Sequence, residues 1–196
     1  MHKKIPKIFV YLDKLEQNFL RNNITNIGVI YRNYESKKRL NNLLEIANYC
    51  KKNKCPLFIS NDLKLALKVK AAGVYIPAFN KIGINHYNLG KKNLTILGSA
   101  HNQKEIINKM NQKCSVIFIP PIFKPSKNKK KLGILKFNIL TKNRKVAFYA
   151  LGGINENNLK ELKLTNQSGF AGIEMFKKKT GPKLDRFFKV FSSYIT

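Results

Sequence analysis

The sequence predicts an α/β fold, a single compact (β/α)8 TIM barrel, from two observations. Short apolar runs rich in β-branched and aromatic residues recur along the whole chain, and segments with apolar residues at helical spacing separate them. The runs are apolar throughout rather than alternating with polar residues, which is typical of a parallel sheet with helices outside it. Eight such runs favour a closed barrel, with a doubly wound open sheet as the alternative.

The expected elements follow one another without a Pro/Gly-rich linker. The eight expected strands are residues 7–12, 26–32, 56–60, 73–78, 94–100, 115–121, 146–153 and 170–176. Amphipathic helices are expected at residues 37–54, 62–73, 102–113, 155–165 and 182–195. The 196 residues lie at the short edge of barrel lengths, so the helices and loops must be minimal, and the segment after Lys81 is expected to be only partly helical.

Composition indicates one domain, residues 1–196, of a soluble cytoplasmic protein. Hydrophobic residues make up 43% of the chain and charged residues 24%, which is the balance of a globular protein. No apolar run approaches the roughly 20 residues that cross a bilayer. The basic N-terminus lacks the long apolar stretch and the cleavage site of a secretory signal. The three cysteines, without a CxxC pair, favour reduced thiols and argue against a zinc site.

The formal charge of +28 raises the question of a polyanionic partner. Lysines are scattered along the chain, and the densest run, Lys124–Lys131, has no interleaved aromatic residues. The sequence contains no RNP-like, zinc-finger or helix-turn-helix pattern. We therefore expect a solvated basic surface and no specific nucleic-acid partner, and leave open whether the charge is functional or compositional.

Polar residues at the C-terminal ends of the expected strands form the candidate site. In chain order they are Arg32, Asn61, Asp62, Asn80, Ser99, His101, the segment "PPIFKPSK", Gly152, Gly153, Asn155 and Lys177. Parallel strands bring these ends to one face of a barrel. A single carboxylate among amides, hydroxyls, cations and glycines suits a phosphorylated ligand, bound directly or through a metal ion. The set does not suit a Ser/His/Asp hydrolase.

Two of these turns have both a structural and a functional interpretation. Asn61 and Asp62 follow an apolar strand and precede a helix, so they either only cap that helix or also face a ligand. Gly152 and Gly153 precede Asn155, and this turn either only requires glycine or brings backbone N–H groups to a phosphate. Its place between the seventh and eighth strands favours the phosphate.

The motifs and their order resemble the thiamine phosphate synthase/TenI family. The resemblance runs from "NIGVIYR" through "PLFISNDLKLALKVKAAGVYI", "ILGSAH", "PPIFKPSK" and "YALGGINENNLKEL" to "GFAGIEMF". It implies a barrel that joins a hydroxymethylpyrimidine pyrophosphate to a thiazole phosphate and releases pyrophosphate. It also implies Mg²⁺ as the cofactor and these two phosphorylated precursors of thiamine as ligands.

The resemblance gives roles to residues in the first half of the chain. Arg32 matches the basic residue that ends the family's second-strand motif. Asn61 and Asp62 match its Asn-Asp pair, in which the Asp helps to hold magnesium on the pyrophosphate. Ser99 and His101 match a Ser-x-His after strand five, where the Ser is a pyrophosphate ligand. Asp62 is thus the predicted magnesium ligand, and Asp62 and Ser99 are predicted catalytic residues.

It also gives roles to residues in the second half. Ser126 and Lys127 match the end of a Thr-x-Thr-Lys loop that touches the substrates, and Lys127 is a predicted catalytic residue. Gly152-Gly153 match the glycines at the thiazole phosphate. Lys124 and Lys177 stand where the family has neutral hydroxyls, so they either bind phosphate oxygens or are solvated lysines of a lysine-rich chain.

Departures from the family pattern leave the activity open. Ile30 stands where synthases carry a Gln, and Asn80 lies nearest the place of a second magnesium carboxylate. Pro121 stands where TenI thiazole tautomerases carry a His. The leading hypothesis is a synthase, the main alternative is a non-catalytic or regulatory paralogue that binds a phosphorylated thiamine precursor, and a tautomerase comes third. The oligomeric state, including a homo-oligomer, stays open.

Overall fold

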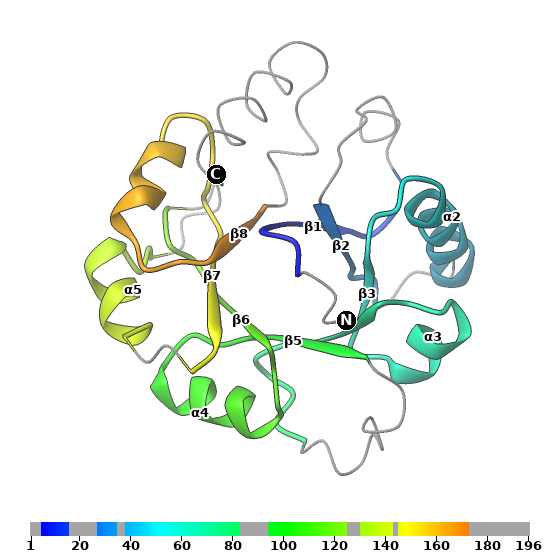
Figure 1. The fold of residues 1–196 in the computed structure, drawn as a ribbon, viewed down its shortest axis with the longest axis horizontal. Coiled ribbons are helices and arrows are strands. Elements are labelled where there is room, and N and C mark those ends of the chain that lie inside the picture. Colours follow the sequence, from blue (N-terminus) through cyan, green and yellow to red (C-terminus); the bar gives the residue numbers. More distant parts are fainter. Residues whose placement is uncertain are drawn as a thin grey trace.

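The strands of the computed structural model close into a parallel barrel, which confirms the predicted fold class (Figure 1). The structure describes residues 5–15, 27–34, 38–82, 94–124, 130–142 and 145–172. Within these ranges each strand pairs with its neighbours in chain order, and the last strand pairs with the first. The strands are β1 (Ile8–Leu12), β2 (Ile27–Tyr31), β3 (Leu57–Ser60), β4 (Gly73–Ile76), β5 (Thr95–Ser99), β6 (Val116–Ile119), β7 (Ala147–Leu151) and β8 (Gly169–Gly172). Each overlaps a predicted strand.

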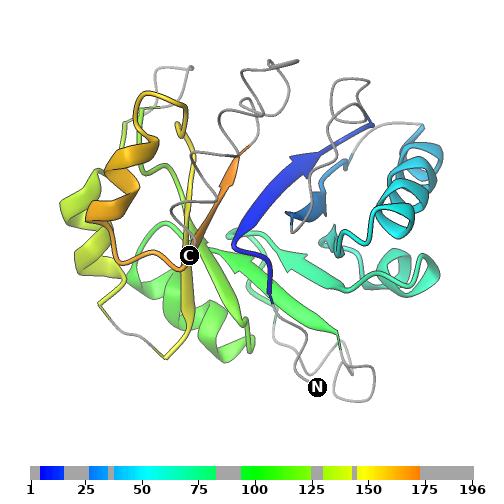
Figure 2. The ribbon, with the colours of Figure 1, turned by 45° about the horizontal axis from the view of Figure 1, so that its top comes forward.

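Helices surround the barrel on its outside (Figures 1 and 2). They are α2 (Arg39–Lys52), α3 (Leu63–Lys68), α4 (Gln103–Asn111), α5 (Ile134–Leu140) and the 3-10 helix η3 (Leu159–Leu164). None of the helices within the described ranges is long and apolar enough to cross a membrane. The helix predicted for residues 182–195 lies outside the described residues.

Helix α3 is shorter than the predicted helix, which was expected to continue to Gly73. It ends early because Lys70 has a left-handed backbone conformation, with φ of 51°. The N–H groups of Lys70 and Ala71 then donate to the carbonyls of Leu67 and Ala66, which closes the last turn. A lysine with positive φ also follows α2 and α4, at Lys54 and Lys113.

Two helical segments differ from the prediction in kind. Helix α5 was not predicted, and it begins after Gly133 without a side-chain cap. The expected helix at residues 155–165 is instead the 3-10 helix η3, preceded by Asn158. The Asn158 side chain does not cap this helix, because it donates to the carbonyl of Gly153 and accepts from the N–H of Asn155. A helix therefore forms within the predicted range, but it is a 3-10 helix that begins four residues later, at Leu159.

Aromatic side chains fill the inside of the barrel. The rings of Phe9, Phe58, Phe118 and Tyr149 meet edge to face, with centroids 5.3–5.7 Å apart for the pairs that involve Phe9. Small neighbours make room for them: a Cβ added at Gly28 would lie 2.4 Å from the Phe9 ring. The interior is thus a packed core rather than a pore, so ligands must bind at an end of the barrel.

Two tyrosines of this interior point to opposite ends. Tyr149 donates its hydroxyl hydrogen to the carbonyl of Pro6, which precedes β1, over 3.0 Å. Tyr11 lies near the other end of β1, and its ring meets that of Tyr75 at a centroid distance of 5.5 Å. Tyr11 and Tyr75 lie at the end of the barrel where the candidate site residues gather.

Candidate functional site

The barrel brings the predicted site residues of the described ranges to the C-terminal ends of its strands, as expected. Arg32 follows β2, Asn61 and Asp62 follow β3, Asn80 follows β4, Ser99 and His101 lie at the end of β5, Lys124 follows β6, and Gly152 and Gly153 follow β7. Ser126, Lys127 and Lys177 lie outside the described residues.

Asp62 caps helix α3, which confirms the structural interpretation of this residue. Its Oδ1 accepts a hydrogen bond from the N–H of Leu65 over 2.9 Å. Its Oδ2 lies 3.1 Å from Nη2 of Arg39, the first residue of α2. The side chains of Arg39 and Asp62 are 29% and 25% exposed, so the pair lies at the edge of solvent. Both carboxylate oxygens are therefore bonded within the protein.

Asn61 and Asn80 bond to each other across the ends of β3 and β4. Asn61 has φ of 55°, a left-handed conformation that asparagine tolerates better than most residues. Its Oδ1 accepts from Nδ2 of Asn80 over 2.6 Å. The Asn80 Oδ1 in turn accepts from the N–H of Ile82. Asn80 is 8% exposed. Its buried side chain holds the turn together through these two hydrogen bonds.

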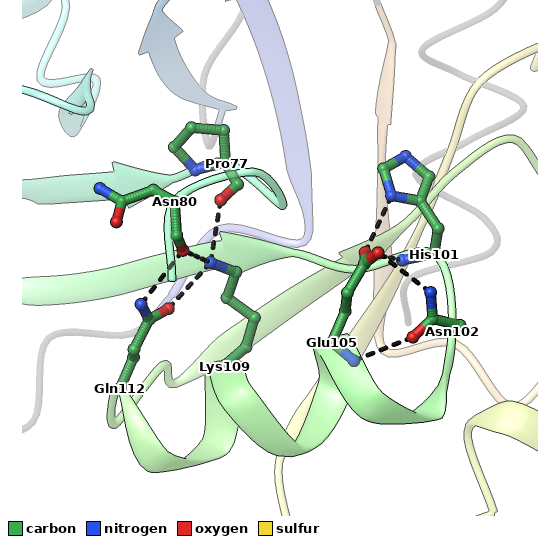
Figure 3. A network of polar contacts seen from close by, with 7 residues as sticks. All are labelled: Pro77, Asn80, His101, Asn102, Glu105, Lys109 and Gln112. Atoms are coloured by element: carbon green, nitrogen blue, oxygen red, sulfur yellow. Dashed lines mark hydrogen bonds and ion pairs between the residues drawn. The ribbon is translucent and has the colours of Figure 1, made fainter. Parts of the chain in front are cut away.

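A buried lysine on α4 holds the turn that carries Asn80 (Figure 3). Lys109 is 1% exposed, and its Nζ donates to the carbonyls of Pro77 and Asn80 over 2.9 and 2.7 Å and to Oε1 of Gln112 over 2.8 Å. Burial lowers the pKa of Lys109. We call Pro77, Asn80, Lys109 and Gln112 the Lys109 network. Sequence reasoning missed it.

Glycine in β5 makes room for this lysine. A Cβ added at Gly98 would lie 2.9 Å from Cδ of Lys109 and 2.8 Å from Sγ of Cys114. The aliphatic part of the Lys109 side chain therefore packs against β5 at Gly98, where the strand has no side chain. A glycine in an apolar strand, opposite a lysine on the apolar face of the following helix, was the available sequence signal.

His101 belongs to the start of α4 (Figure 3). Its backbone N–H donates to Oε2 of Glu105 over 2.8 Å, and its ring Nδ1 lies 3.0 Å from the same oxygen. Asn102 caps the helix by accepting from the N–H of Glu105. Burial raises the pKa of Glu105, but the hydrogen bonds from His101 and Asn102 outweigh it and the net shift is downward. His101 thus has a structural role, and its predicted contact with phosphate stays a prediction.

Hydroxyl groups line the barrel just below these turns. Burial raises the pKa of Tyr75, while a hydrogen bond with Ser99 opposes this rise. Ser99 itself is buried. Tyr34, half-exposed after β2, shares a hydrogen bond of 2.6 Å with the buried Ser60. Sequence reasoning included only Ser99, although tyrosine and serine at alternate positions of apolar strands could have indicated the others.

The Gly152-Gly153 turn requires glycine at both positions. Their φ angles are 89° and 71°, and a Cβ at Gly153 would lie 2.4 Å from the carbonyl oxygen of Phe123. The N–H groups of Asn155 and Asn158 already donate to asparagine side chains of the same turn. These two groups are therefore not free for a phosphate, contrary to the expectation of a helix start at Asn155.

The described residues do not fit a magnesium site built by the protein. No group of three His, Cys, Asp or Glu side chains lies together in the described ranges. Asp62 is bonded through both oxygens, and Asn80 supplies an amide already bonded to Asn61 and Ile82. Magnesium usually binds one or two carboxylates that are available to it. Asp62 stays the predicted ligand, and no chemical step below depends on a metal.

The fold defines a (β/α)8 barrel, a class of protein in which ligand sites lie at the C-terminal ends of the strands. The family model described as "Thiamine monophosphate synthase" matches residues 12–176. The chain therefore belongs to this thiamine phosphate synthase/TenI family, as the sequence motifs predicted.

Sequence comparison with known proteins also relates this chain to thiamine-phosphate synthases. The chain is similar to the thiamine-phosphate synthase of Prochlorococcus marinus strain AS9601, with 31% identity over 172 residues that cover 83% of this chain and 48% of the relative. It is 24% identical to the "Putative thiamine-phosphate synthase 2" of Aquifex aeolicus, covering 88% of this chain and 98% of the relative. This chain thus spans about half the length of the Prochlorococcus protein.

Among solved structures, the thiamine phosphate pyrophosphorylase from Pyrococcus furiosus shares the fold. Its TM-score is 0.71 at 21% identity, covering 86% of each chain. A 4-hydroxy-2-oxoglutarate aldolase has a TM-score of 0.65 at 14% identity. Barrels with different chemistry are therefore nearly as similar in shape, and the fold alone does not select a reaction.

Proposed function

We propose that this protein joins a hydroxymethylpyrimidine pyrophosphate to a thiazole phosphate and releases pyrophosphate, in the cytoplasm. The observation that carries the proposal is the family match, because residues 12–176 include the strand ends that hold Arg32, Asn61, Asp62 and Ser99. The ligands of this proposal are the two phosphorylated precursors of thiamine.

The proposed reaction requires charge stabilisation more than proton transfer. The bond between the pyrimidine methylene and the pyrophosphate breaks, and its electron pair leaves with the pyrophosphate. The lone pair of the thiazole nitrogen forms the new C–N bond. Negative charge builds on the leaving group, where Arg32, Lys124 and Lys127 would stabilise it and Ser99 would donate a hydrogen bond. Preorganised charges and donors of this kind commonly contribute more to catalysis than any other effect.

The remaining predicted residues would hold phosphate groups in place. Gly152 and Gly153 let a thiazole phosphate approach the backbone, and Lys177 would add a positive charge beside it. Asn61, His101 and Ser126 complete the proposed binding set. The Asn61 amide is already oriented by its bond to Asn80.

Product formation tests the proposal directly. Purified protein is given both substrates with magnesium, and thiamine phosphate is measured. Asp62→Asn is the matched variant, because asparagine caps a helix as well as aspartate but carries no charge. We expect product from the wild type and little from the variant. Lys127→Ala should lower turnover more than stability, and unchanged turnover with normal melting would remove Lys127 from the mechanism.

A binding paralogue without turnover is the second candidate. The observation that favours it is that the side chains of Asp62 and Asn80 are bonded within the protein rather than presented to a ligand. A folded wild type that is stabilised by either substrate but forms no product would support this candidate over the transferase.

A further inference from the structure

Tyr11 carries a buried hydroxyl with an unused hydrogen-bonding capacity. The residue is 3% exposed, and its hydroxyl oxygen has no hydrogen-bond partner among the described residues. Buried polar groups are normally bonded, and one that is not weakens the fold without a ligand. Among the described residues the Tyr11 hydroxyl therefore keeps its capacity to bond a further group, and a ligand is one such group.

The position of Tyr11 is at the boundary between the apolar interior and the polar rim. Its ring packs edge to face with the rings of Tyr75 and Phe118, at centroid distances of 5.5 and 6.2 Å. The charge of Arg32, on the rim after β2, is close enough to lower the pKa of Tyr11 against the larger rise caused by burial. Aromatic rings thus pack against Tyr11, and Arg32, whose backbone N–H donates to the carbonyl of Leu12, brings a cation to the same end of β1.

The surroundings of the Tyr11 hydroxyl leave it available to a ligand. Tyr11 of β1 is paired in register with Ile30 of β2, whose side chain is apolar and fully buried. Burial and then the nearby Tyr75 hydroxyl raise the pKa of Tyr11, yet the two hydroxyls do not meet the geometry of a hydrogen bond. The Tyr11 hydroxyl is therefore well placed to bond an atom of a ligand at the C-terminal ends of β1 and β2.

We propose that the Tyr11 hydroxyl recognises the ring of the pyrimidine pyrophosphate, by bonding a ring nitrogen or amino group while Arg32 binds the pyrophosphate. This rests on the proposed function. A phenol both donates and accepts, which suits a nitrogen heterocycle that presents acceptors and a donor along one edge. Tyr11 thus determines specificity through its hydroxyl, while its ring stays part of the core.

Two matched Tyr→Phe variants test the proposal. Tyr11→Phe removes the unbonded hydroxyl, and Tyr149→Phe removes the hydroxyl that is bonded to Pro6 at the opposite end of the same interior. For each protein the melting temperature is measured, together with the Kd for the pyrimidine pyrophosphate and for inorganic pyrophosphate. Inorganic pyrophosphate reports on the anion site alone.

The expected results for the two variants are opposite. Tyr11→Phe should melt at the same or a higher temperature, bind the pyrimidine pyrophosphate about tenfold more weakly, and bind inorganic pyrophosphate unchanged. Tyr149→Phe should melt at a lower temperature and bind both ligands as the wild type does.

Three outcomes would overturn the proposal. They are an unchanged Kd for the pyrimidine pyrophosphate in Tyr11→Phe, an equal loss for both ligands, and a wild type that does not bind the pyrimidine pyrophosphate. A wild type that binds it without forming thiamine phosphate counts against the proposed reaction only, because the comparison of Kd values still tests Tyr11.

Discussion

The Lys109 network and the Tyr11 hydroxyl lie at the same end of the barrel, and they differ in how their polar atoms are bonded. Lys109 is as deeply buried as Tyr11, yet its ammonium group donates to three acceptors. The Tyr11 hydroxyl has none within the described part of the chain. A bonded polar group fixes the loops around it, whereas an unbonded one keeps its capacity for a ligand. The comparison distinguishes residues that hold the loops at this end of the barrel in place from residues that remain able to bond a ligand there.

Replacing Lys109 should give the largest change in stability. We expect Lys109→Met to lower the free energy of unfolding by about 3 kcal/mol, because three hydrogen bonds of the ammonium group are lost and each contributes about 1 kcal/mol. The Asn80 carbonyl keeps its bond from Nε2 of Gln112. Urea denaturation measures the change. Lys104→Met, at an exposed position of the same helix, is the control. Equal stability of Lys109→Met and the control would show that the Asn80 turn holds without the lysine.

Alkaline pH should change the contributions of the interior tyrosines and of Lys109 to stability with opposite sign. Burial raises the pKa of Tyr149 to about 12, so above pH 10 the unfolded chain ionises first and stability falls by up to about 1.4 kcal/mol per pH unit. Tyr11 and Tyr75, whose pKa values are also raised, contribute in the same direction. Lys109, with a lowered pKa, contributes stability that increases towards the pKa of the unfolded chain, 10.5.

The tyrosines outnumber the lysine, so a net loss is expected above pH 10. Chemical denaturation at a series of pH values measures it, with Tyr149→Phe as the comparison. The decline in this variant should be shallower than in the wild type. An identical slope in both proteins would contradict a raised pKa for Tyr149.

The cap at Asp62 should give a smaller effect. Asp62→Ala removes the acceptor for the N–H of Leu65, and losing such a cap costs about 1 kcal/mol. Asp62→Asn should retain most of that stability, since asparagine caps equally well. Thermal melts of the two variants check this, and equal destabilisation by both would mean that the contact with Arg39 matters more than the cap.

The smallest stability change is expected at Arg39. Arg39→Gln breaks a partly exposed ion pair, so the free energy of unfolding should change by less than about 1 kcal/mol. It also releases Oδ2 of Asp62 from the guanidinium. Binding of the pyrimidine pyrophosphate should therefore depend more steeply on magnesium than in the wild type. Calorimetric titrations at several magnesium concentrations would reveal this, and an unchanged dependence would argue against Asp62 as a magnesium ligand.

Much of the fold could be predicted because the strands are apolar over their whole length, as in "IFVYL" and "VIFI". Helix α5 was missed because it is short and begins at Gly133, without a side-chain cap to indicate its start. The helix expected at residues 155–165 is the 3-10 helix η3, which begins only at Leu159, because the side chains of Asn155 and Asn158 bond the preceding turn. Local pattern does not show which of two partners an asparagine takes.

Site residues could be predicted where they and their bonding partners lie close together in the sequence, within one turn. Asn61 and Asp62 were identified from their place between a strand and a helix, and the cap is confirmed. Arg39 was not, because it precedes Asp62 by 23 residues and only the barrel brings the two together. Lys109 was overlooked in so lysine-rich a chain, and only Gly98 in the preceding strand indicated where a lysine could be buried.

The lysines that end α2, α3 and α4 have a consequence for engineering this protein. Lys54, Lys70 and Lys113 have φ angles of 53°, 51° and 56°, where a side chain is disfavoured by roughly 1 kcal/mol relative to glycine. Glycine at all three positions would lower the formal charge from +28 to +25, since each substitution removes one charge. Charge reduction and backbone relaxation therefore coincide at these positions, and a less basic variant need not be a less stable one.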